Sequence, residues 1–100
     1  MTATHPRHGL DSALQAPVRL SIVAMLAGMD KAEFSLVRDT IEVSDSVLSK
    51  QSQNLEDAGY VAITKGFVGK RPRTWFSLTD DGRVAFERHI AALRQIAGAD

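Results

Sequence analysis

The sequence contains no cysteine, and this absence alone excludes several kinds of site. A chain without cysteine has no disulfide framework, no thiolate metal site and no thiol redox sensor. Long apolar runs are also missing: none approaches the ~18 residues that a membrane-spanning helix needs. Residues 1–9 lack the apolar stretch of a signal peptide. We therefore expect a cytoplasmic protein without a membrane partner.

The chain also has no net charge, because twelve lysine and arginine residues balance twelve aspartate and glutamate residues. Overall neutrality argues mildly against nucleic-acid binding. The charges are unevenly distributed, however, since residues 60–78 include Lys65, Lys70, Arg71 and Arg73 but no acidic residue. One pole of a neutral molecule is therefore expected to be basic.

The length of 100 residues, 44% of them hydrophobic, fits one globular domain with a single core. Residues 1–9 predict a flexible N-terminal arm, which leaves residues 10–100 for the domain. The spacing of apolar residues predicts a first helix that begins at Pro17 and ends near Gly28. Proline suits the first position of a helix. Ser35 is the predicted N-cap of a short second helix, and Ser44 that of a third helix running to about residue 58.

Two strands are predicted at residues 60–64 and 74–78, which are rich in β-branched and aromatic residues. Residues 65–73 would then form a long hairpin tip. Thr79 is the predicted N-cap of a final helix, residues 80–97. This order of elements is that of a winged helix-turn-helix. The predicted fold class is α+β, mainly α, with a two-stranded β-wing and terminal dimerisation helices.

The third helix divides into an inner and an outer face when its residues are placed at helical intervals. The inner face comprises Ser44, Leu48, Ser52 and Leu55, with Ala58 beside them, whereas the outer face is polar. Gln and Asn side chains pair with adenine in a major groove, Lys pairs with guanine, and Ser pairs with either base. An ordinary solvated face is the alternative interpretation. The predicted base-reading residues are Ser46, Ser49, Lys50, Gln53 and Asn54.

The predicted hairpin tip favours the DNA interpretation. Arg71 and Arg73 flank Pro72, which stiffens the chain. An arginine held on a stiff tip suits a narrow, electronegative minor groove. We therefore predict that Lys70, Arg71 and Arg73 make the wing contacts, with a solvated, charged hairpin as the alternative.

Taken together, these segments resemble the single-domain winged-helix regulators of the MarR, ArsR and PadR families of prokaryotic transcription factors. Residues 37–50 resemble their helix-turn-helix, residues 55–61 the exit from the recognition helix, and residues 69–83 the wing and the start of the final helix. The resemblance covers residues 10–97. It implies that the third helix enters the major groove, that the wing touches the adjacent minor groove, and that the terminal helices build a homodimer.

Two departures from the family pattern concern three positions. Glu42 stands where the family often has glycine in the turn between the second and third helices. Gln51 and Ser52 stand where it usually has histidine and a large apolar residue. Either Ser52 packs against a bulky neighbour, or the third helix is slightly rotated.

The last helix carries an apolar stripe that fits the implied dimer. The stripe consists of Phe86, Ile90, Leu93 and Ala97, which recur at heptad-like spacing and would remain exposed in a monomer. A small-molecule effector would have to bind at this interface, because 100 residues leave little room for a sensor domain. The predicted interface comprises Leu10, Leu14, Phe86, Ile90, Leu93 and Ala97.

Catalytic and metal chemistry have little support in the sequence. His5 and His8 would need a third metal ligand within reach. Asp80 and Asp81 are explained by their place at a helix start, where the helix dipole favours acidic residues. The chain has no Ser-His-Asp order, phosphate loop or dinucleotide fingerprint in the right context. We therefore expect no enzyme activity, no cofactor and no metal.

The leading functional prediction is a homodimeric transcriptional regulator that binds double-stranded DNA sequence-specifically. The alternative is a winged-helix protein–protein interaction module without direct DNA binding, because a fold alone does not define a function. The basic tip discriminates between them: lysine and arginine suit phosphates, whereas protein interfaces favour aromatic and apolar anchors.

Overall fold

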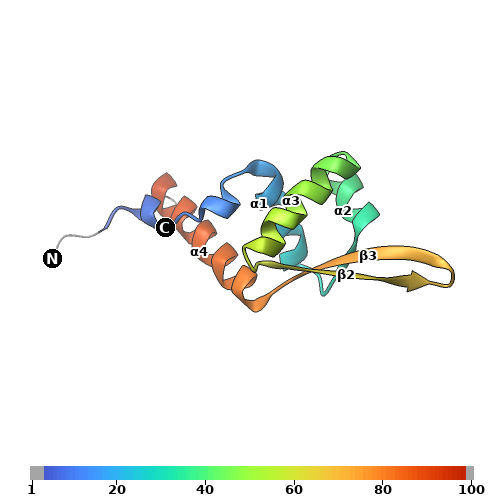
Figure 1. Cartoon of the computed structure of the whole chain (residues 1–100). Helices are drawn as coiled ribbons and strands as arrows, with labels where there is room; N and C mark the ends of the chain where they lie inside the picture. The colour runs from blue at the N-terminus through green and yellow to red at the C-terminus, as the bar shows by residue number, and fades with distance from the viewer. Residues whose placement is uncertain (1–3, 99–100) are drawn as a thin grey trace.

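Within residues 4–98, which the computed structural model describes, the chain forms four α-helices and a three-stranded antiparallel sheet (Figure 1). The predicted winged-helix class, α+β and mainly helical, is confirmed. The element order is η1 (Pro6–Gly9) and η2 (Ser12–Leu14), both 3₁₀ helices, then α1 (Pro17–Ala27), β1 (Ala32–Glu33), α2 (Phe34–Ile41), α3 (Asp45–Asp57), β2 (Val61–Val68), β3 (Arg71–Leu78) and α4 (Asp80–Ala97).

Two of the predicted helix caps form and one does not. The Ser44 hydroxyl accepts a hydrogen bond from the Val47 N–H at 3.2 Å, and the Thr79 hydroxyl accepts one from the Gly82 N–H at 2.9 Å. The prediction of Ser35 as an N-cap is wrong. Glu33 occupies that position in extended backbone, because it still belongs to β1, and α2 begins directly after it.

The sheet has strand order β1-β3-β2, so the predicted two-stranded wing gains a short third strand at its base. The wing hairpin is longer than predicted, because β2 and β3 pair continuously until Val68 lies opposite Arg71. Only Gly69 and Lys70 remain in the turn, where Gly69 adopts a left-handed φ of +63°. The wing therefore projects as a ribbon with a tight tip (Figure 1).

The core lies between the helices and the base of the sheet. Helix α1 contributes Ile22, Val23 and Leu26 to one buried cluster, which also contains Leu48 of α3 and Phe76 of β3. None of the helices in residues 4–98 is long and apolar enough to span a membrane.

Leu14 belongs to this core, and its side chain is fully buried within its own chain. The prediction that Leu14 contributes to a dimer interface is therefore corrected, because a buried side chain is not available to a second chain.

The N-terminal segment is anchored, so the predicted flexible arm is wrong for Pro6–Gly9. This segment forms η1, which packs against α4 at the end of the molecule opposite the wing tip (Figure 1). Residues 1–3 of the predicted arm lie outside the described residues. The Asp11 N–H donates to Nδ1 of buried His89 at 3.0 Å. The Tyr60 hydroxyl donates to the Asp11 carboxylate, and this hydrogen bond, together with burial, raises the pKa of Tyr60 above its ordinary value.

The start of α4 fits closely against the loop that follows α3. The Thr79 N–H donates to the Tyr60 carbonyl at 3.0 Å, and the Thr79 hydroxyl donates to the Gly59 carbonyl at 2.7 Å. A Cβ on Gly82 would lie 2.9 Å from the Tyr60 carbonyl carbon and even closer to its oxygen. Helix and loop can therefore approach this closely only because residue 82 has no side chain.

We predict that Gly82→Ala lowers the free energy of unfolding by about 1–3 kcal/mol or more, since the methyl group overlaps backbone that cannot move aside. This cost exceeds the ~1 kcal/mol by which alanine improves helix propensity. Urea unfolding followed by circular dichroism measures the change. The control is Gly28→Ala, where the nearest atom to a new Cβ is 3.9 Å away. Equal stability of Gly82→Ala and the wild type would contradict the close packing.

Candidate nucleic-acid interface

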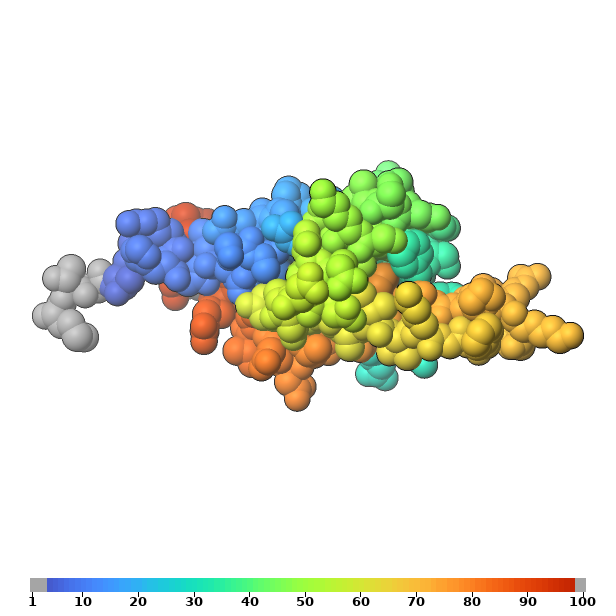
Figure 2. Space-filling view, viewed as in Figure 1, coloured from blue at the N-terminus to red at the C-terminus, as the bar shows by residue number. Residues whose placement is uncertain are grey.

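α3 and the wing are exposed on one face of the molecule. In Figure 2, α3 stands forward in green and the wing extends beside it in yellow and orange. The predicted outer residues of α3 are all exposed, whereas Leu48, Ser52 and Leu55 are buried. The predicted division into two faces is therefore confirmed between the helix ends, but it is wrong for Ser44 and Ala58, which are exposed because they lie at the N-cap and C-cap positions. The exposed residues are Ser46, Ser49, Lys50, Gln53 and Asn54.

The unusual pair Gln51 and Ser52 is explained without rotating α3. The Gln51 side-chain oxygen accepts a hydrogen bond from Arg19 Nη1 at 2.9 Å, which links α3 to α1. The Ser52 hydroxyl donates to the Ser49 carbonyl at 3.1 Å. Ser52 lines the same pocket as the Phe34 and Phe76 rings, so bulky groups do face it.

Two of the exposed side chains on α3 differ in their freedom to reach a base. The Gln53 amide nitrogen donates to Glu56 and Asp57, at 3.0 Å each, so it must exchange these partners before it reads an adenine. Lys50 forms no ion pair with any residue in the described range 4–98. Unlike Gln53, Lys50 therefore needs to exchange no ion-pair partner before it reads a base.

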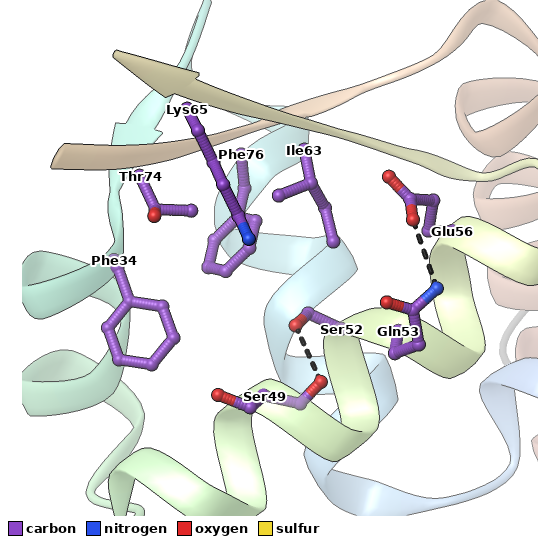
Figure 3. Close-up of a pocket in the computed structure, with 9 residues that line it drawn as sticks. All are labelled: Phe34, Ser49, Ser52, Gln53, Glu56, Ile63, Lys65, Thr74 and Phe76. Atoms are coloured by element: carbon purple, nitrogen blue, oxygen red, sulfur yellow. Dashed lines mark hydrogen bonds between the residues drawn. The ribbon is translucent and has the colours of Figure 1, made fainter. Parts of the chain in front are cut away.

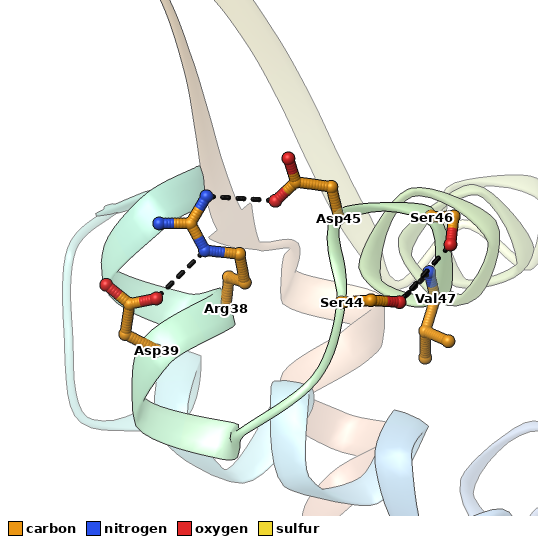
Figure 4. A network of polar contacts seen from close by, with 6 residues as sticks. All are labelled: Arg38, Asp39, Ser44, Asp45, Ser46 and Val47. Carbon is orange, nitrogen blue, oxygen red and sulfur yellow. Dashed lines mark hydrogen bonds and ion pairs between the residues drawn. The ribbon is translucent and has the colours of Figure 1, made fainter.

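The turn between α2 and α3 is held by one arginine (Figure 4). Arg38 pairs with Asp39 on its own helix and with Asp45 in the first turn of α3, both at 2.9 Å. The hydrogen bond from Arg38 lowers the pKa of the Asp39 carboxyl below its ordinary value. Because all three groups are on the surface, they orient the two helices more than they stabilise the fold.

Glu42 occupies the glycine-like position of this turn in the left-handed conformation, with φ 58° and ψ 55°. The departure from the family pattern therefore leaves the turn intact, and its cost is backbone strain.

The wing residues predicted to contact DNA do not behave alike. Lys70 and Arg71 are exposed at the tip. Arg73 lies farther back, opposite Gly66, and its guanidinium pairs with Glu33 of β1. Arg73 therefore lies two cross-strand pairs behind Arg71 and has an acidic partner, and its predicted contact with a minor groove stays a prediction.

A pocket of about 520 Å³ separates α3 from the wing (Figure 3). Phe34, Ile63 and Phe76 form its apolar wall, and Ser49 and Gln53 line it from α3. The Lys65 side chain extends from β2 toward the pocket (Figure 3). Lys65 was not among the predicted contact residues. Strand alternation contained the signal, because Ile63 is inward and residues two apart share a face.

Helix, turn, helix and basic ribbon define a winged helix-turn-helix. Residues 18–97 match the family model described as a winged helix DNA-binding domain, and the chain belongs to this family. An uncharacterized protein, MJ0432 of Methanocaldococcus jannaschii, is 31% identical over 80 residues, which are 80% of this chain and 87% of that protein.

Solved structures agree with the family assignment. A transcriptional regulator homologue from Pyrococcus horikoshii superposes with a TM-score of 0.84 at 29% identity, covering 92% of each chain. The M. tuberculosis regulator MOSR, solved with DNA, shares the fold with a TM-score of 0.72 at 17% identity, over 93% of this chain and 66% of that one. MarR-family members are among the proteins with this fold. The protein is thus related to transcriptional regulators.

We predict that Glu42→Gly raises the free energy of unfolding by about 0.5–1 kcal/mol. The left-handed conformation costs a non-glycine residue about 1–2 kcal/mol, of which glycine's greater unfolded-state entropy offsets ~0.5–1 kcal/mol. Chemical denaturation measures the difference. Thr40→Gly, at an exposed position within helical α2, is the control and should lower stability. A loss of stability in Glu42→Gly as large as in Thr40→Gly would show that residue 42 is not strained.

Proposed function

We propose that the protein is a homodimeric transcriptional regulator that binds double-stranded DNA sequence-specifically, with α3 in the major groove and the wing at the adjacent minor groove. The observation that carries this proposal is the shared exposure of the polar α3 face and the basic wing tip on one side of the molecule.

The pocket between α3 and the wing supports the same docking. A sugar–phosphate backbone separates the two grooves of a duplex, so it would pass between an element in one groove and an element in the next. Lys65, Ser49 and Thr74 line this space and are phosphate-binding residue types. Lys65 therefore joins Lys50, Lys70 and Arg71 as a proposed contact.

The proposed dimer interface lies at the opposite end of the molecule. Leu93 is 38% exposed and Ile96 45% exposed on the last turns of α4, and Ala97 is exposed beside them. Ile90 and Leu10 are half-buried, and Phe86 packs partly against the core. A two-fold axis through this end would bury the apolar surface of both chains and present two copies of α3 to a palindromic site, about 34 Å apart.

The DNA-binding proposal predicts strongly salt-dependent affinity. If the dimer neutralises ~6 phosphates, log K falls against log salt with a slope near −5. Selection from random duplexes followed by fluorescence anisotropy measures both the site and the slope. Failure to bind any duplex at ~50 mM salt would overturn the proposed function.

Two wing variants test which arginine side chains contact the phosphates. Arg71→Ala should weaken binding and reduce the salt slope by about 1, whereas Arg73→Ala should change the slope less, because Glu33 already neutralises that side chain. Equal effects of the two substitutions would show that the Arg73–Glu33 pair opens on DNA.

The dimer proposal predicts that Leu93→Asp sediments as a monomer, because a carboxylate inside an apolar interface costs several kcal/mol. Operator affinity should fall with it, although every DNA-facing side chain remains. Leu36→Asp is the control: Leu36 is 46% exposed, but on α2 near the wing. A wild-type monomer at tens of micromolar protein, measured by analytical ultracentrifugation, would refute the dimer.

A further inference from the structure

The tip of the basic wing carries exposed apolar side chains. Phe67 is 71% exposed and Val68 is 57% exposed, although both lie in a regular strand. Phe67 pairs across the hairpin with Pro72, which is also exposed. Aromatic and apolar groups are not phosphate ligands, so the contacts of Lys70 and Arg71 leave them unexplained.

Strand alternation places Phe67 on a defined side of the ribbon. Ile63 and Lys65 border the pocket beside α3, and residues two apart in a strand share a face. Phe67 therefore continues the α3-facing side, beyond Lys65. Val68, opposite Arg71, lies on the other side.

The charges around Phe67 indicate what covers it. Lys65 lies on the same side of the ribbon, Lys70 and Arg71 lie at the adjoining turn, and residues 60–78 contain no acidic side chain. An aromatic ring near cations fits a polyanion that also offers π-surfaces, and a duplex offers them where a base step between the two phosphate backbones is partly unstacked.

We infer that Phe67 is an apolar wedge: it enters the minor groove beside the proposed α3 site, partly unstacks one base step, and kinks the duplex. Lys65, Lys70 and Arg71 hold the flanking phosphates, and Pro72 stiffens the strand opposite the ring. Such wedges kink DNA by about 20–90° toward the major groove. Specificity at that step then comes from deformability, which favours flexible pyrimidine–purine steps. This inference rests on the proposed function.

The test uses the full chain and a duplex that the wild-type protein selects from a random pool. In one version, 2-aminopurine replaces the adenine at the pyrimidine–purine step nearest the wing, because its fluorescence rises when it unstacks. In a second version, the ends carry a fluorescence-transfer pair that reports the bend. Wild-type protein should raise both signals.

Phe67→Ala should abolish both signals and weaken binding about tenfold, the scale of one lost base–aromatic stack. Val68→Ala, the matched control on the opposite side of the same tip, should retain them. Circular dichroism confirms that both variants fold. Binding by the wild type without a rise in either signal, or equal signals from Phe67→Ala and the wild type, overturns the wedge and leaves the proposed function standing.

Two further outcomes separate the alternatives. If Phe67→Ala changes the sedimentation of the protein without DNA, the tip is a contact between copies of this chain and the wedge is overturned. If the wild type selects no duplex, the proposed function fails and the wedge fails with it.

Discussion

The structure depends on the contact between the start of α4 and the loop that follows α3. Thr79 donates to the Gly59 and Tyr60 carbonyls, and the bare backbone of Gly82 lies against Tyr60. Both strands of the wing begin or end at this junction, so it fixes the direction of the wing relative to α3. It also directs α4 away from the wing (Figure 1). The basic wing tip and the exposed Leu93 and Ile96 therefore lie at opposite ends of the molecule.

That separation explains how a chain without net charge can belong to a DNA-binding family. Four of the twelve lysine and arginine residues lie on the wing, within residues 60–78, which contain no acidic residue. Acidic side chains lie around α3, where Asp45 pairs with Arg38 and Glu56 accepts from Gln53. The proposed DNA contacts therefore depend on where the cations are placed as well as on their number, and Arg38 and the rigid junction help to fix that placement.

The wing itself combines two kinds of surface. Arg73 is tied to β1 and Lys31 lies over the Trp75 ring at 5.3 Å, so the base of the wing is held by internal contacts. The tip instead exposes two cations and the Phe67 side chain. A stiff ribbon that ends in an aromatic ring is suited to sensing how easily a duplex deforms, in addition to its charge.

The sequence by itself determined the local features: the order of the four α-helices and the two wing strands, the caps at Ser44 and Thr79, and the two faces of α3. These depend on residues within about one helical turn of each other, or on strand alternation, so periodicity predicts them. Only the tertiary structure decided that Leu14 is core, that Pro6–Gly9 packs on α4, and that Arg73 belongs to Glu33. Each of these contacts joins segments far apart in the chain, and strand register and helix docking, which no local pattern encodes, bring them together.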